Sequence, residues 1–81
     1  MKYVVINVIE REILKVGVAD TPIEATEILR RDFMNEWDNI GCTEEDFEEG
    51  IGRGDEWELN ATEAWINTSN ANYDWRIIEV D

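Results

Sequence analysis

The chain of 81 residues contains no histidine and a single cysteine, Cys42. Without histidine, a Ser-His-Asp triad, a Cys-His pair and a histidine-ligated metal site are all excluded within one chain. A single cysteine allows no internal disulfide, and the acidic neighbours of Cys42 oppose formation of its thiolate. The sequence therefore predicts a protein that is not an enzyme and that holds no cofactor.

Long apolar runs and basic clusters are also missing. No apolar stretch approaches the roughly 20 residues of a membrane-spanning helix, and the apolar run at residues 3–6 is too short for a signal peptide. We therefore expect a soluble, cytoplasmic protein that does not bind membranes. The bases are too sparse to attract a phosphate backbone, so direct binding of nucleic acid is not expected.

Negative charge is what the chain has in excess. It carries 20 acids against 7 bases, for a net charge of −13. Residues 1–31 carry equal numbers of acids and bases, so the whole excess lies in residues 32–81, and most of it in residues 32–58. This asymmetry predicts a one-sided electrostatic field, because the length is that of a single domain, residues 1–81.

Alternating apolar residues predict the strands. Residues 3–9 alternate, with Val4, Ile6 and Val8 on one face. Residues 13–18 repeat the alternation after a short polar link, which predicts an antiparallel hairpin. A short strand is expected at residues 55–60, with Trp57 and Leu59 pointing inward, and a last strand at residues 73–80.

One main helix is predicted by its cap and its periodicity. Thr21-Pro22-Ile23-Glu24 is a capping box with proline at the first helical position. The helix is expected to run to about Asp38. Its buried stripe is predicted from apolar residues at three- and four-residue spacing: Ala25, Ile28, Leu29, Phe33 and Trp37.

Two further capping patterns predict short helices. Thr43 precedes a run of acids and starts one over residues 43–49, while Asn60 with Glu63 caps another that contains Trp65. The four tryptophans are expected to close one core. The predicted fold is therefore α+β: an N-terminal antiparallel β-hairpin, one main amphipathic helix on a three- to four-stranded sheet, two short helices and a C-terminal strand.

Parts of this pattern resemble a known group of proteins. The hairpin, the Asp20-Thr21-Pro22 cap, the Glu24-Ala25 helix start and the closing residues 75–80 resemble small uncharacterised acidic α+β proteins of bacterial phages and mobile elements. The resemblance covers about half of the chain and is architectural, since its motifs are cap and strand patterns. It implies an association with mobile elements and assigns no functional residue.

The most acidic stretch is the candidate binding surface for a basic protein. The acids expected to contact this partner are Glu44, Glu45, Asp46, Glu48, Glu49, Asp55, Glu56 and Glu58. A fixed array of carboxylates can imitate the phosphates of duplex DNA. Together with the resemblance, this leads to the hypothesis of a nucleic-acid-mimicking inhibitor of a host nuclease or defence complex.

Three alternatives remain for the same acids. They could serve solubility only. They could hold a divalent cation, which needs only clustered oxygens, although residues 38–49 lack the alternating acids of an EF-hand loop. A small enzyme is the third alternative. The glycine-rich residues 50–54 are surrounded by acids, so phosphate binding is not expected there.

Overall fold

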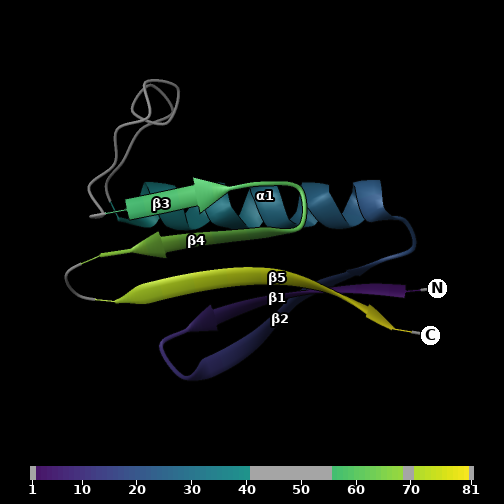
Figure 1. Ribbon diagram of the computed structural model, residues 1–81, viewed down its shortest axis with the longest axis horizontal. Coiled ribbons are helices and arrows are strands. Elements are labelled where there is room, and N and C mark those ends of the chain that lie inside the picture. The colour runs from purple at the N-terminus through teal and green to yellow at the C-terminus, as the bar shows by residue number, and fades with distance from the viewer. Residues whose placement is uncertain (1, 41–55, 69–70, 81) are drawn as a thin grey trace.

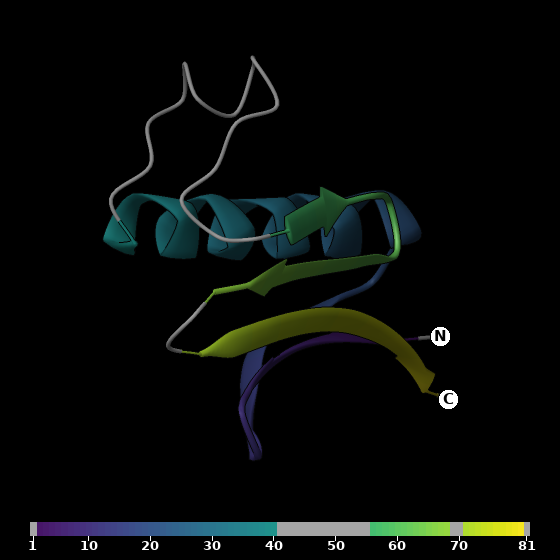
Figure 2. The ribbon, with the colours of Figure 1, turned by 60° about the vertical axis from the view of Figure 1, so that its left-hand side comes forward.

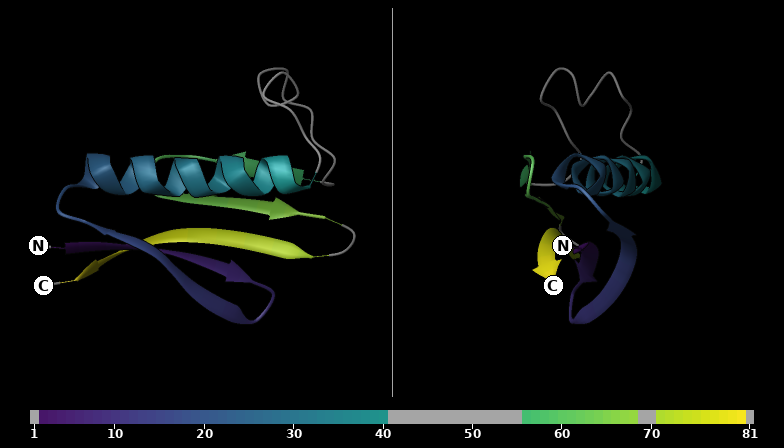
Figure 3. Two further views of the ribbon diagram at one scale, coloured as in Figure 1. Left: turned by 180° about the vertical axis from the view of Figure 1, so that it is seen from behind. Right: turned by 90° about the vertical axis from the view of Figure 1, so that its right-hand side faces the viewer.

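The computed structural model describes residues 2–40, 56–68 and 71–80. Its elements are β1 (Lys2–Ile9), β2 (Glu12–Ala19), α1 (Pro22–Asn39), β3 (Glu56–Leu59), β4 (Glu63–Asn67) and β5 (Asn72–Val80). The strands form one antiparallel sheet in the order β2-β1-β5-β4-β3, and α1 packs on one of its faces (Figures 1 and 3). The α+β class, the N-terminal hairpin and the C-terminal strand are confirmed. No described element covers the other face of the sheet (Figures 2 and 3).

The main helix forms as predicted. The Thr21 hydroxyl accepts a hydrogen bond of 3.2 Å from the backbone N–H of Glu24, and Pro22 is the first helical residue. Four members of the predicted stripe are fully buried: Ala25, Leu29, Phe33 and Trp37. The fifth, Ile28, is partly buried against them. The stripe therefore supplies the helical half of the core.

Strand β2 contains one irregularity that lets α1 come close. Val5 lies opposite Gly17 and Ile6 lies opposite Lys15, so Val16 is an extra residue in β2. A Cβ atom at Gly17 would lie 3.2 Å from Cγ2 of Ile28. Because glycine has no Cβ, Ile28 of α1 can approach the backbone of β2 closely beside this bulge.

Aromatic rings fill the space between α1 and the sheet. Phe33 and Trp37 stack with centroids 5.9 Å apart, and Trp57 lies 5.1 Å from Trp37. Trp75 meets Phe33 edge to face at 5.3 Å. Trp37 and Trp75 are fully buried, and Trp57 packs from β3 against the core that contains them. Trp65 lies half-buried on β4 between the inward-facing Ala64 and Ile66, so the prediction that it closes the core is wrong.

The predicted short helix after Asn60 is also wrong, because residues 63–67 form strand β4. The Asn60 carboxamide oxygen accepts from the N–H groups of Thr62, at 3.0 Å, and Glu63, at 2.9 Å. The same local pattern serves a helix cap and a tight turn, and here it closes the β3–β4 turn. The sheet therefore has five strands instead of three or four. The other predicted short helix, residues 43–49, lies outside the described residues, of which α1 is the only helix.

The β1–β2 turn is tied to the start of β5. Glu10 adopts a positive φ of 57°. Its N–H donates to the carbonyl of Asn72 at 3.1 Å, and its carboxylate accepts from the N–H of Asn72 at 3.1 Å. These two bonds extend the β1–β5 pairing into the turn and hold Glu10 in a conformation that glycine more often adopts.

Candidate functional site

Acids gather where the chain leaves α1 and enters β3. These two points lie at the same end of the molecule (Figure 1), and the rings of Trp37 and Trp57 are in contact there. We call this region the acidic end and define it by the acids of the last turn of α1 and of β3: Glu36, Asp38, Glu56 and Glu58. Of the eight predicted contact residues, Glu56 and Glu58 lie here. The other six lie outside the described residues.

The acids at the end of α1 are unfavourably placed for the helix. The last turn of α1 contains no base, and the carbonyl end of a helix dipole repels negative charge. Burial raises the pKa of Glu36 above its ordinary value, and the nearby charge of Asp32 raises it further, against a hydrogen bond from the side chain of Asn39. Residues that break a local stability rule often mark a functional surface.

Asp32, one turn earlier, has a structural task. Its carboxylate accepts a 2.7 Å hydrogen bond from Nε1 of the buried Trp75. A buried indole N–H usually requires such a partner. The half-buried Asp32 therefore supports the core by its bond to Trp75, although the sequence counts it among the acids of residues 32–58. No sequence pattern links these two residues, because 43 positions separate them.

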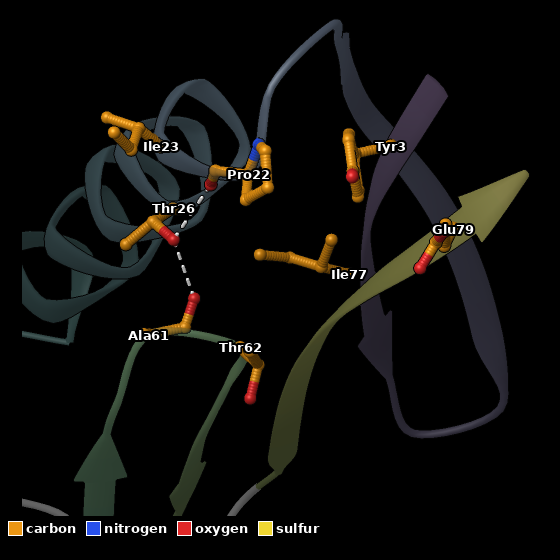
Figure 4. Close-up of a pocket in the computed structure, with 8 residues that line it drawn as sticks. All are labelled: Tyr3, Pro22, Ile23, Thr26, Ala61, Thr62, Ile77 and Glu79. Atoms are coloured by element: carbon orange, nitrogen blue, oxygen red, sulfur yellow. Dashed lines mark hydrogen bonds between the residues drawn. The ribbon is translucent and has the colours of Figure 1, made fainter. Parts of the chain in front are cut away.

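A pocket of about 400 Å³ lies at the opposite end of the molecule. It opens between the first turn of α1, the β3–β4 turn, the start of β1 and the end of β5 (Figure 4), and is lined by Tyr3, Pro22, Ile23, Thr26, Ala61, Thr62, Ile77 and Glu79. The Thr26 hydroxyl is 2.7 Å from the carbonyl of Ala61 and 3.0 Å from that of Pro22, so its proton is shared between them. The sequence does not predict this pocket, because the pairing of β1 with β5 assembles it.

Lys2, at the start of β1, forms an ion pair with Asp20. The hydrogen bond and the charge of Asp20 raise the pKa of Lys2, and Lys2 in turn lowers the pKa of Asp20. Both side chains are exposed, so the pair contributes little to stability.

The sheet face turned away from α1, which we call the open face, carries apolar and charged residues. Side chains alternate along each strand, so the neighbours of the buried Val5, Ile66 and Trp75 point away from the helix. Its apolar members are Val4, Ile6, Val8, Ile13, Val18, Trp65, Ile78 and Val80. Its charged members with described side chains are Lys2, Lys15, Arg76, Glu58, Glu63 and Asp74.

Neither a metal centre nor a membrane span is found in the described parts of the chain. Residues 2–40, 56–68 and 71–80 hold no group of three acidic or cysteine side chains that could bind a metal ion. In the same ranges no helix is long and apolar enough to cross a membrane. Comparisons with protein families, curated proteins and solved structures find no match. The acidic end, the pocket and the open face are therefore the candidate functional regions of the described chain.

Proposed function

We propose that this protein is a non-enzymatic interaction module whose acidic end binds a basic protein. The supporting observation is the pair of acids at the end of α1, Glu36 and Asp38, with no base in the last turn, beside the acids of β3. The six remaining candidate acids lie in the chain between these elements. Acids at this end of a helix lower its stability, so acids that served solubility alone would be expected at other surface positions.

The net charge of −13 defines the chemistry of the partner. A strong one-sided field speeds the encounter with a basic surface and suppresses binding to acidic ones. The finer form of the proposal is a partner whose nucleic-acid groove the acids occupy, such as a host nuclease or defence complex. The density of carboxylates in residues 44–58 and the resemblance to mobile-element proteins support this form.

Charge reversal tests the proposal against the solubility alternative. A partner is recovered from host extract at low salt, released at high salt and purified. Its association rate is then measured with a variant in which Glu45, Glu48 and Glu49 are changed to Lys. The matched control changes Glu24, Glu27 and Glu79 to Lys, which alters the net charge equally but leaves residues 32–58 intact.

We expect the first variant to associate about tenfold more slowly and the control to change by about twofold or less. Equal rates for the two variants would contradict the proposal, because only the total charge would then matter. For the finer form, duplex DNA should compete with the protein for its partner. Simultaneous binding of DNA and protein would contradict that form alone.

A further inference from the structure

We infer that the open face is a self-association surface on which a second copy of the chain packs. Of the six large hydrophobic residues that the described chain leaves exposed, four lie on this face: Ile13, Val18, Ile78 and Val80. They surround the half-buried Val4 and Ile6 of β1. Exposed apolar residues that lie next to one another in this way often mark an interaction site.

The charges of this face select a second copy over a basic partner. By register the open face carries three bases and four acids, Glu56 included, whereas the rest of the described chain carries nine acids and three bases. A basic protein would therefore be drawn to other surfaces. A second copy meets a net charge of only −1 on this face, apart from Asp20, which already pairs with Lys2 just beyond β2.

The signs are also separated across the sheet. The bases lie on β2, β1 and β5, and the acids lie on β5, β4 and β3. Consider a two-fold axis that runs parallel to the strands, just outside the open face at the central β5. It places β2 of one copy over β3 of the other, and β1 over β4. In such an isologous contact, Lys15 of each copy faces the side of its partner that carries Glu58. The face is therefore complementary to itself in charge.

The size of the face fits a weak dimer. Its 34 strand residues, at about 3.3 Å per residue and about 4.8 Å between strands, span roughly 540 Å² in projection. Two such faces bury roughly 1,100 Å², which is in the range of transient interfaces. We therefore expect a reversible dimer with a dissociation constant of about 10 µM or weaker.

Sedimentation equilibrium of the complete chain tests the inference. Between about 10 µM and about 1 mM protein, the mass should rise from 9.5 kDa towards twice that value. Added salt should tighten the dimer, because it screens the repulsion between two chains of charge −13. A chain that stays monomeric at about 1 mM in high salt would overturn the inference. The binding of a basic partner is weakened by salt, so either proposal can fail without the other.

Two isoleucines provide a matched pair of variants. Ile13, on the open face, is 68% exposed, and Ile23, at the rim of the pocket, is 73% exposed. Ile13→Lys should weaken the dimer at least about tenfold, whereas Ile23→Lys should change it by about twofold or less. Both side chains are exposed, so neither change should disturb the fold, and circular dichroism of each variant is the check. Equal effects of the two variants would show that the chains meet through another surface.

A charge exchange tests the axis. Lys15→Glu and Glu58→Lys should each weaken the dimer about threefold or more, and the double variant should recover most of the loss. If the losses of dimer affinity in the two single variants simply add in the double variant, the arrangement about a strand-parallel axis is overturned.

Discussion

At the scale of single residues, Asn7 is the least expected member of the core. It is 3% exposed on the helix-facing side of β1, and its side-chain oxygen has no hydrogen-bond partner in the described part of the chain. A buried acceptor without a partner costs about 1–3 kcal/mol. The alternation of residues 3–9 predicts that Asn7 and Val5 share a face. It does not predict that α1 covers this face, since both faces of β1 are largely apolar.

Replacing Asn7 by a nearly isosteric apolar residue should therefore stabilise the protein. We expect Asn7→Leu to raise the free energy of unfolding by about 1 kcal/mol, measured by urea denaturation. Asn7→Asp should lower it, because it adds a charge at a buried position. A clear loss of stability in the leucine variant would mean that the carboxamide oxygen has a partner after all.

The hydrogen bond between Asp32 and Trp75 gives a second prediction. Asp32→Ala should lower the free energy of unfolding by about 1–3 kcal/mol, because the buried indole N–H loses its acceptor. Asp32→Asn keeps an acceptor oxygen and should cost less. Urea denaturation followed by tryptophan fluorescence measures both variants. Equal stabilities of the two would show that the charge of Asp32 matters and the hydrogen bond does not.

At the scale of elements, α1 begins favourably and ends unfavourably. Its start has the Thr21 cap, observed at 3.2 Å. Thr21→Ala should lower the free energy of unfolding by about 1 kcal/mol, while Thr21→Ser should retain most of it. Thermal and urea denaturation measure the difference. An alanine variant as stable as the wild type would contradict the role of the cap.

The end of α1 makes stability depend on pH. The pKa of Glu36 is raised in the folded chain above its ordinary 4.5. A carboxyl group that binds its proton more tightly when folded makes folding more favourable as pH falls. The gain begins at the folded pKa and is complete below about 4.5. The stabilising pair of Lys2 with Asp20, whose pKa is lowered from 3.8, is lost only at lower pH.

Glu36→Gln removes this dependence. At pH 7 the variant should be more stable by about 0.3 kcal/mol, a small gain because the side chain remains in contact with water. Its free energy of unfolding should also change less between pH 7 and pH 4.5. Urea denaturation across this range is the measurement, with Glu27→Gln as the exposed mid-helix control. A variant that loses stability at pH 7 would contradict the raised pKa.

The elements that were predicted correctly have strong local signals. The hairpin follows from alternation, and α1 follows from the Thr21 cap and the apolar stripe at three- and four-residue spacing. Strand β4 was missed because Asn60 and Glu63 resemble a helix cap, and because five residues are too few for alternation to overrule it. The pairing of β4 with β3 and β5 decides that residues 63–67 form a strand, and a local sequence pattern does not reveal this pairing.

At the scale of the whole molecule, the sequence shows which charges the chain carries more clearly than it shows where the fold places its residues. The charge asymmetry is visible by counting, and it leads to the acidic end. The pairing of β5 between β1 and β4 is not visible, because these strands are distant in sequence. The pocket and the open face both depend on this pairing, so neither could be predicted. The outward position of Trp65 follows from the same cause.

The most direct test of the acidic end is the salt dependence of association with a purified basic partner. If the acids of residues 36–58 carry the encounter, the association rate should fall at least about tenfold between about 50 and about 500 mM salt. The variant with lysine at residues 45, 48 and 49 should show a clearly shallower fall than the wild type. An association rate that is independent of salt, with the same slope in both proteins, would contradict the account.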